Sequence, residues 1–194
     1  MRETTIERKT NETHIKLTIN IDGTGKNSIK TPIKFFNHML EQFSSHGHFD
    51  IFLEVNSFDT DPHHTIEDTA IVLGSGILKA LGDKKGIKRF AHTIIPMDEA
   101  LAMTSIDISG RAFCNIETEI PEEKINDFDT ILVKHFFQSF AANSLTTIHI
   151  KQVRGEDSHH IVEAIFKSFA RTLAQACEIN EKFKDITPST KGVL

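Results

Sequence analysis

Apolar positions along this chain recur at two spacings, every second residue in some segments and every third or fourth in others. Residues 14–21 (HIKLTINI) alternate apolar and polar side chains, which predicts a β-strand, and DGTGK predicts a turn into a second strand. Residues 35–47 (FFNHMLEQFSSHG) predict a short helix, and residues 49–55 (FDIFLEV) predict a further strand. A long helix follows and stops near LGDKKG, because one apolar stripe runs through Ile66, Ala70, Leu73, Ile77 and Leu81.

The second half of the chain repeats this order of elements. Strands are predicted within residues 101–120, a helix within 130–144, a strand over 145–153 and a last helix from Ser158 to about Glu178. Its apolar stripe lies 96 residues after the first one, since 162 − 66 = 96, and consists of Val162, Phe166, Phe169, Leu173 and Cys177. The chain therefore predicts an internal duplication.

Each half has the predicted order strand, strand, helix, strand, helix. We expect an α+β fold of internally duplicated ββαβα units, with sheets that have helices packed on one face and with pseudo-twofold related halves. The expected parts are residues 1–91, residues 92–185 and a C-terminal tail of residues 186–194 (ITPSTKGVL), which is predicted to be extended. Because no segment is typical of a flexible linker, we expect these parts to form one packed body.

A histidine pattern is duplicated together with the apolar stripes. The pattern His-His-x-x-Glu opens both long helices, and one further histidine lies in the helix before each copy, at an offset of 135 − 38 = 97. A single histidine pair at a helix start is usually a polar cap, but duplication of a fold does not by itself require metal-ligating residue types to recur. The recurrence therefore favours metal ligands, namely His38, His63, His64, Glu67, His135, His159, His160 and Glu163.

The geometry of a helix limits how these ligands are shared. Successive residues are about 100° apart, so His63 and His64 diverge while Glu67 lies between them. We expect each histidine of a pair to face a different ion, and each ion to have three imidazoles and one carboxylate. The sequence leaves open which histidine serves which ion. Nitrogen and oxygen donors suit Mn²⁺, Fe²⁺, Co²⁺ and Zn²⁺ about equally.

The composition of the chain limits which partners and which cellular compartment we expect for the protein. The 194 residues carry a formal net charge of −5, which gives no basic field of the kind that nucleic-acid binding requires. The first residues are charged and no apolar run reaches membrane-spanning length, so we expect a cytoplasmic protein with no nucleic-acid or membrane partner. Cys114 and Cys177 lack a metal-type spacing and are predicted to be core thiols.

Several segments, in one order, resemble the imidazoleglycerol-phosphate dehydratase family over essentially the whole chain. They are FFNHMLEQFSSHGHFDI, HHTIEDTAIVLG, ALGDKKGIKRF, PMDEAL, ISGR, HFFQSFA, HHIVEAIFKSFARTL and the terminal PSTKG. The chain departs from the family's usual pattern at Pro32, Asn37 and Ala70, and none of these positions is a predicted ligand.

The resemblance implies an activity and a set of site residues. Members of the family dehydrate D-erythro-imidazole glycerol phosphate to imidazole acetol phosphate in histidine biosynthesis, with two Mn²⁺ ions per active site and with sites shared between the chains of a 24-subunit homo-oligomer. The eight side chains above are then the metal ligands. The matching substrate-binding positions are Glu12, His38, His46, Arg89, Arg111, Ser189, Thr190 and Lys191.

The chemistry of this reaction assigns a role to one carboxylate. The proton to be removed lies on a carbon with no adjacent carbonyl, so a base alone is insufficient and the leaving hydroxyl must be activated. The expected mechanism binds the substrate's imidazole as imidazolate between two cations, and Glu12 is the candidate catalytic base or proton shuttle. Asp98 and Glu99 of PMDEAL are accessory candidates, with a structural role as the alternative.

Two other function classes remain open at this point. A binuclear metallohydrolase would use the ions to activate water, but the excess of histidine over carboxylate and the lack of an obvious bridging aspartate speak against it. A metal-storage shell would bind ions without catalysis, although ferritin-like di-iron sites use more glutamates and a four-helix bundle. An assay against phosphoesters distinguishes the first class, and metal binding without dehydratase activity distinguishes the second.

Overall fold

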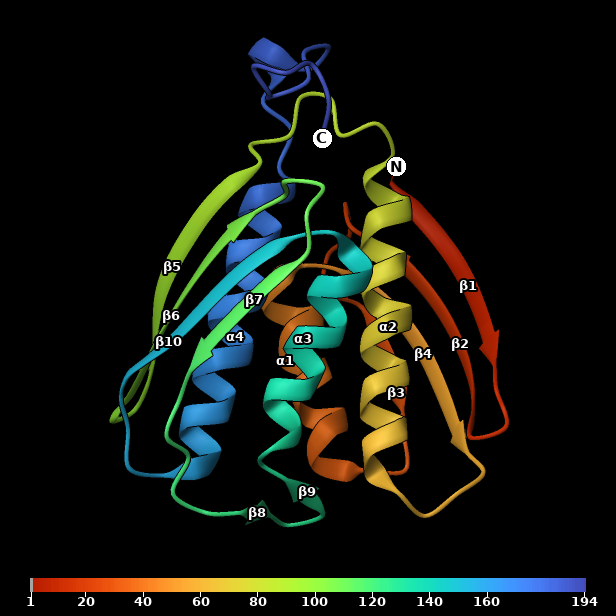
Figure 1. Ribbon diagram of the computed structural model, residues 1–194, viewed down its shortest axis with the longest axis vertical. Helices are drawn as coiled ribbons and strands as arrows, with labels where there is room; N and C mark the ends of the chain where they lie inside the picture. The colour runs from red at the N-terminus through yellow and green to blue at the C-terminus, as the bar shows by residue number, and fades with distance from the viewer. Residues whose placement is uncertain (1) are drawn as a thin grey trace.

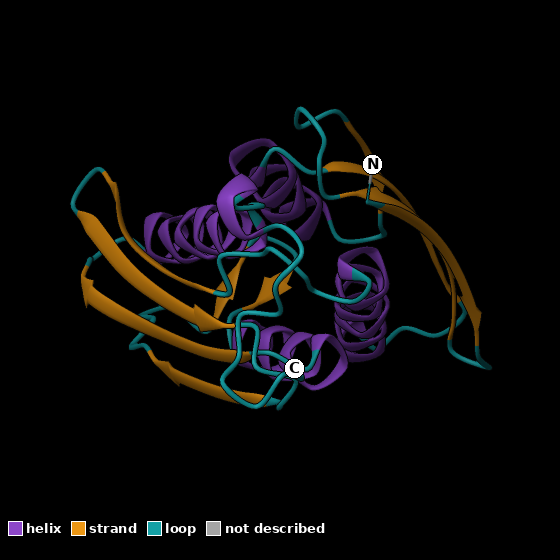
Figure 2. Cartoon of the chain, turned by 90° about the horizontal axis from the view of Figure 1, so that it is seen from above, coloured by secondary structure: helices purple, strands orange, loops and turns teal. Residues whose placement is uncertain are grey.

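Two β-sheets with helices between them make up the protein. The structure is a computed structural model and describes residues 2–194. In Figure 1 the sheets form two outer walls, and Figure 2 shows from above that the helices fill the space between them. Among the described residues, no helix is long and apolar enough to cross a lipid bilayer.

The first half contains four strands and two helices. Its sheet has the order β1-β2-β4-β3, in which β3 runs parallel to β4 and the other neighbours are antiparallel. The elements are β1 (Glu3–Lys9), β2 (Thr13–Asn20), β3 (Asn27–Lys30), α1 (Lys34–Gly47), β4 (Asp50–Ser57) and α2 (Pro62–Leu81).

The second half repeats this topology and adds a small hairpin. Its sheet has the order β5-β6-β10-β7, with β7 parallel to β10. The elements are β5 (Phe90–Met97), β6 (Ala100–Asp107), β7 (Phe113–Glu117), the hairpin β8 (Lys124–Ile125) and β9 (Phe128–Asp129), α3 (Leu132–Ser144), β10 (Thr147–Arg154), α4 (Ser158–Cys177) and the short 3₁₀ helix η1 (Glu181–Phe183).

The structure confirms the predicted α+β class, the duplication and the helices on one face of each sheet. It also corrects the order of elements, because each half begins with one more strand and is βββαβα. The added strands β1 and β5 are edge strands, and their sequences ETTIERK and FAHTIIPM lack a clean alternation of apolar and polar residues. Strand β5 includes residue 91, where the sequence suggested a boundary between halves.

One apolar core is shared by both halves. The two predicted stripes on α2 and α4 are buried, and α2 packs on α3 while α1 packs on α4. Phe43 of α1 illustrates the contact, since its ring stacks on Phe169 at 5.5 Å and meets the edge of Phe140 at 6.4 Å. Burial of an aromatic side chain contributes about 1.5–3 kcal/mol, so these rings hold the two halves together.

All four long helices begin at the same end of the molecule, the lower end in Figure 1. Asp61 and Asp157 cap α2 and α4, and they accept hydrogen bonds from the backbone N–H groups of His63 at 2.9 Å and His160 at 3.1 Å. Both histidine pairs therefore lie in the first turn of a capped helix.

Candidate metal centre

The structure brings three predicted ligands from both halves together at the lower end. His38 of α1 and His159 of α4 point their Nε2 atoms at one oxygen of Glu163, at 3.2 and 3.1 Å. Glu163 is 7% exposed in its side chain, whereas the histidines are 39% and 40% exposed. We call His38, His159 and Glu163 cluster 1. Two imidazoles and a carboxylate with their donor atoms this close fit a divalent cation.

The related cluster in the other helix pair is more open. The rings of His63 on α2 and His135 on α3 lie 4.7 Å apart between centroids, and His63 Nε2 is 3.7 Å from Glu67 Oε2. The side chain of Glu67 is 43% exposed. We call His63, Glu67 and His135 cluster 2. Each cluster thus takes one histidine from one half and a histidine and glutamate from the other.

The second histidine of each pair turns away from its neighbour. The rings of His63 and His64 are 6.0 Å apart at an interplanar angle of 85°, and those of His159 and His160 are 6.0 Å apart at 77°. This divergence agrees with the helical geometry anticipated from the sequence. His64 and His160 therefore belong to neither cluster within one chain.

A carboxylate holds the Nδ1 atom of each outlying histidine. Asp59 Oδ2 lies 2.7 Å from His64 Nδ1, and Glu99 Oε2 lies 2.8 Å from His160 Nδ1. The Asp59 hydrogen bond raises the pKa of His64, and the Glu99 hydrogen bond raises the pKa of His160. With Nδ1–H donating to a carboxylate, Nε2 is the nitrogen that presents its lone pair outward.

Acidic side chains also face these outward nitrogens. Glu12 Oε1 is 3.7 Å from His64 Nε2, and Asp98 Oδ2 is 3.8 Å from His160 Nε2. Glu12 lies in the turn between β1 and β2, and Asp98 lies in the equivalent turn between β5 and β6. Glu12, Asp59 and His64 form a group separate from clusters 1 and 2, and its donor atoms are also close enough together to hold an ion.

Backbone groups fix Glu99 in its ionised form. The N–H of Asp157 donates to Glu99 Oε1 at 2.9 Å, and the side chain of His160 binds the other oxygen. These hydrogen bonds, with that of Asp157 the stronger influence, lower the pKa of Glu99 to about 2. Glu99 thus ties the β5–β6 turn to the start of α4.

Sequence reasoning missed Asp59 and Lys167. Lys167 Nζ lies 2.6 Å from Glu163 Oε1, the oxygen that faces away from His38 and His159. Burial alone would raise the pKa of Glu163, but hydrogen bonds from Lys167, His38 and His159 outweigh it and the net shift is downward. The i, i+4 spacing of these residues on α4 was a signal that could have identified Lys167.

Of the remaining predicted substrate contacts, His46 lies near the end of α1, and the others lie at the opposite end of the helices from the clusters, namely Arg89, Arg111, Ser189, Thr190 and Lys191. His46, in the last turn of α1, has a lowered pKa because burial disfavours its charged form and Lys167 and Arg171 repel it. The backbone N–H of Arg89 bonds to the carbonyl of Ala176, near the end of α4. Ile108, three residues before Arg111, donates its N–H to the carbonyl of Arg89.

The C-terminal tail folds back over this upper end instead of extending as predicted. Arg89 Nη1 donates to the carbonyl of Pro188 at 2.8 Å, while Nε and Nη2 of the same guanidinium donate to Asp107 Oδ1 at 2.7 Å and Oδ2 at 3.2 Å. Turns follow, in which the N–H of Lys191 bonds to Ser189 Oγ at 3.2 Å and Thr190 lies between them. The structure thus brings Arg89 and the PSTKG segment together, since one guanidinium anchors the tail.

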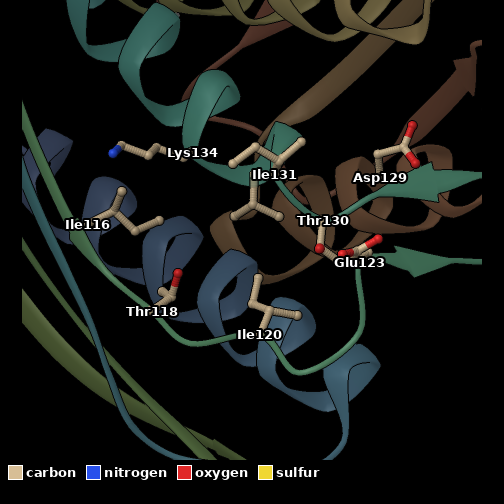
Figure 3. Close-up of a pocket in the computed structure, with 9 residues that line it drawn as sticks. Ile116, Thr118, Ile120, Glu123, Asp129, Thr130, Ile131 and Lys134 are labelled. Carbon is tan, nitrogen blue, oxygen red and sulfur yellow. The ribbon is translucent and has the colours of Figure 1, made fainter.

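A hollow with a volume of about 600 Å³ lies elsewhere, between β7, the hairpin β8–β9 and the start of α3. Figure 3 shows Ile116, Ile120, Ile131 and Lys134 around it. Within the described residues, its lining includes none of the predicted ligands or substrate contacts. This hollow is therefore separate from the candidate metal centre.

Comparison with known proteins identifies the family. The model of the family described as imidazoleglycerol-phosphate dehydratase matches residues 31–173, a range that includes all eight predicted metal ligands. The chain belongs to the imidazoleglycerol-phosphate dehydratase family. It is therefore a dehydratase of histidine biosynthesis, a carbon–oxygen lyase.

Relatives of this dehydratase match along its whole length. The imidazoleglycerol-phosphate dehydratase of Caldicellulosiruptor bescii is 53% identical over 190 residues, which are 97% of this chain and 96% of that protein. The Methylorubrum populi dehydratase is 48% identical over 195 residues and 100% of both chains.

Solved structures of dehydratases share the fold. The Staphylococcus aureus enzyme superimposes with a TM-score of 0.84 at 36% identity, over 92% of this chain and 99% of that one. The Pyrococcus furiosus enzyme in complex with (S)-C348 also has a TM-score of 0.84 and 36% identity, over 97% and 100% of the two chains.

Proposed function

We propose that this dehydratase converts D-erythro-imidazole glycerol phosphate to imidazole acetol phosphate at a site that holds two Mn²⁺ ions. The observation that carries the proposal is the pair of clusters, each with two histidines and a glutamate drawn from both halves. Nitrogen and oxygen donors without thiolate suit Mn²⁺, and the family resemblance selects it among the ions that such donors bind.

Each ion would take a fourth ligand from an outlying histidine. Cluster 1 and cluster 2 each supply three donors, and His64 and His160 each present Nε2 away from their own cluster. Two cations bound there would supply positive charge that favours the anionic form of the substrate's imidazole ring, which would make the hydroxyl on the carbon attached to the ring a better leaving group. The orientation of Nε2 by Asp59 and Glu99 supports this use of the second histidine of each pair.

Glu12 is the proposed base or proton shuttle. Its carboxylate lies 3.7 Å from His64 Nε2, beside one of the proposed metal ligands. A carboxylate there takes the proton from the carbon next to the one that loses hydroxide, and the resulting enol becomes the ketone. Atoms balance, because the proton and the hydroxide leave together as water.

The arginines and the tail would bind the phosphate of the substrate. Arg89 and Arg111 supply guanidinium groups, while Ser189, Thr190 and Lys191 supply two hydroxyls, an ammonium group and backbone N–H groups. Arg89 now binds Asp107, so a phosphate dianion would share or replace that contact.

The length of α4 favours a site shared between chains. The backbone of Arg89 is bonded to Ala176, which is 17 residues after His159 on the same helix, or about 25 Å along its axis. A substrate whose ring and phosphate are joined by a short carbon chain cannot reach both ends. We therefore propose a homo-oligomer in which the phosphate contacts at each site come from a different chain than the metal clusters, with 24 subunits as the size that the family resemblance implies.

The direct test supplies imidazole glycerol phosphate to Mn²⁺-reconstituted protein and follows formation of the ketone. We expect turnover that chelation abolishes and that His64→Ala and His160→Ala each reduce by at least about 100-fold, because each variant loses an ion ligand. Analytical ultracentrifugation gives the number of subunits. Ketone formation that is unaffected by complete metal removal would disprove the metal mechanism.

A further inference from the structure

Helix α1, which carries His38, begins without a polar cap of its own. Its N-cap residue is Ile33, and its first turn contains no acidic residue. Helices α2 and α4, by contrast, start at Asp61 and Asp157, whose carboxylates bond to the first backbone N–H groups. The N–H groups at a helix start have no partner within the helix, so α1 requires an acceptor from elsewhere.

Asp127, in the turn of the hairpin β8–β9, supplies that acceptor. Its Oδ2 accepts the N–H of Lys34 at 2.7 Å, and its Oδ1 accepts the N–H of Phe35 at 3.1 Å. Although burial opposes ionisation of this carboxyl, the two N–H groups outweigh it and hold the pKa of Asp127 below its ordinary value. A side chain of the second half therefore caps a helix of the first half.

The hairpin is fixed against both helices of cluster 1. Phe128 is 1% exposed and its ring lies 5.3 Å from that of Phe35 on α1. At the base of the hairpin, Thr130 Oγ1 donates to the carbonyl of Glu122 at 2.8 Å, and the N–H of Glu122 donates to Ser158 Oγ at 3.0 Å. Thr130 is labelled in Figure 3. The hairpin thus contacts the starts of α1 and α4 together.

The capped turn of α1 leads directly to the cluster. His38 follows Lys34 by one helical turn, and Phe35 meets the ring of His159 edge-on at 5.1 Å. A shift of the first turn would move His38 relative to Glu163, whose oxygen is 3.2 Å from the histidine nitrogen. The position of α1 therefore decides whether the three donors converge.

Cluster 2 offers an internal comparison. In the first half, residues 31–33 connect β3 to α1, whereas in the second half the longer segment 118–131 connects β7 to α3 and contains the hairpin. Helix α3 begins at Leu132, and within the described part of the chain its N-cap residue Ile131 makes no side-chain cap hydrogen bond. The hairpin is thus an insertion in the second half of the chain, and it caps helix α1 of the first half, which carries His38 of cluster 1.

We propose that Asp127 is a positioning residue for cluster 1, which sets the place of His38 by capping α1 and has no equivalent for cluster 2. This inference rests on the metal function proposed above. It predicts that substitution of Asp127, which contacts neither ion, weakens the binding of the ion at cluster 1 and leaves the binding of the ion at cluster 2 unchanged.

The test is Mn²⁺ binding to the full-length protein, measured by equilibrium titration of the free-ion electron paramagnetic resonance signal. In Asp127→Ala we expect one class of sites to keep its wild-type affinity and the other to weaken by at least about tenfold, the range typical of groups that orient metal ligands. Asp127→Asn keeps an acceptor oxygen at the helix start and is expected to bind within about threefold of wild type.

Two further variants assign the effect. Asp129→Ala removes the other carboxylate of the same hairpin. This carboxylate is 3.5 Å from Lys124 and, within residues 2–194, does not cap α1, so the variant should leave the affinity of both classes of sites unchanged. His135→Ala removes a ligand of cluster 2. The class of Mn²⁺ sites that remains in this variant should therefore be the one whose affinity falls when Asp127 is also replaced by alanine. If Asp127→Ala does not fold, Asp127→Glu replaces it, because its longer side chain displaces α1 and should weaken the same class.

The outcomes separate the two proposals. Equal weakening of both classes in the Asp127 variants, or weakening of neither, overturns the positioning role while the metal function stands. Absence of Mn²⁺ binding by the wild-type protein overturns the metal function itself and the positioning role with it.

Discussion

Glu12 and Asp98 occupy matching places beside the outlying histidines, one in each half. Both lie in the turn between the first two strands of a repeat, and both face the Nε2 atom of a histidine at 3.7 and 3.8 Å. These distances do not distinguish them. Glu12 is the proposed base because the family resemblance makes it a substrate contact, and one active site requires one base for the carbon-bound proton.

Glu12→Gln tests the assignment of the base. We expect kcat to fall by about 10²- to 10⁴-fold with an unchanged Mn²⁺ content, since a general base contributes in that range. Asp98→Asn is the matched control and should stay within a few-fold of wild type. The assignment is wrong if Glu12→Gln keeps nearly full turnover, and it moves to Asp98 if the two results are exchanged.

The two thiols are expected to be inert in the folded protein. Burial raises the pKa of Cys177 to about 12 and that of Cys114 to about 11, so neither forms appreciable thiolate near pH 8. A thiol-specific disulfide reagent should therefore react slowly with native protein and release two equivalents after unfolding. Rapid release from the native protein would show that a thiolate is accessible.

At the scale of elements, a charge pair fastens the edge strand β1 to helix α2. Arg8 Nη1 approaches Asp68 Oδ1 to 2.6 Å, and Thr13 Oγ1 donates to the other oxygen at 2.5 Å. The approach of Arg8 is poorly aligned, since its Nη1 makes no hydrogen bond of good geometry within residues 2–194. The side chain of Asp68 is 7% exposed and that of Arg8 is 34% exposed, so this ion pair is partly buried.

Removal of Arg8 should therefore destabilise the protein by an intermediate amount. Arg8→Met keeps an apolar stem but leaves Asp68 with Thr13 alone, and we expect a loss of about 1–3 kcal/mol in the free energy of unfolding measured with urea. Glu7→Ala, on the exposed side of the same strand, should change it by less than about 0.5 kcal/mol. Equal effects of the two variants would contradict a role for this ion pair.

Asp50, at the start of β4, gives a pH dependence with a definite sign. The N–H of Thr24 at 2.8 Å, and also that of Lys26 at 2.9 Å, donates to its Oδ1 and lowers its pKa below the ordinary 3.8. A carboxyl with a depressed pKa stabilises the fold above its unfolded-state pKa and loses this effect as the pH falls through the folded-state value. These bonds hold the turn between β2 and β3.

The comparison that isolates Asp50 is between wild type and Asp50→Asn, both metal-free, in urea at pH 7 and at pH 3. The stability gap should be larger at pH 7 and shrink at pH 3, where the wild-type carboxyl begins to be protonated. Other titrating groups are the same in both proteins and cancel. A gap that does not change with pH would exclude this linkage.

For the whole molecule, the proposed sharing of each site between two chains predicts complementation between inactive variants. His159→Ala removes a metal ligand, and Arg111→Glu removes a phosphate contact at the far end, so each variant alone should be inactive. Co-assembly of equal amounts of the two variants should restore about one quarter of wild-type activity. A site is intact only if the chain that supplies its cluster has His159 and the chain that supplies its phosphate contact has Arg111, and each condition holds for about one half of the sites. Mixed oligomers that stay inactive would mean that each chain forms its own site.

The sequence was a reliable guide wherever a contact is set by local periodicity. The stripes of α2 and α4 and the divergence within each histidine pair follow from helical spacing, which is a property of neighbouring residues. Strands β1 and β5 were missed because an edge strand with many polar residues has little apolar alternation.

What the sequence determined by itself is the internal duplication and the set of side chains predicted as ligands, because both follow from fixed spacings along the chain. The tertiary structure decided which ligands meet: α1 pairs with α4 and α2 with α3, so each cluster mixes the two halves. It also decided that Asp59 and Lys167 hold ligands and that Asp127 caps α1 from 93 residues away. Such contacts depend on the packing of distant segments in one core, which no local pattern encodes.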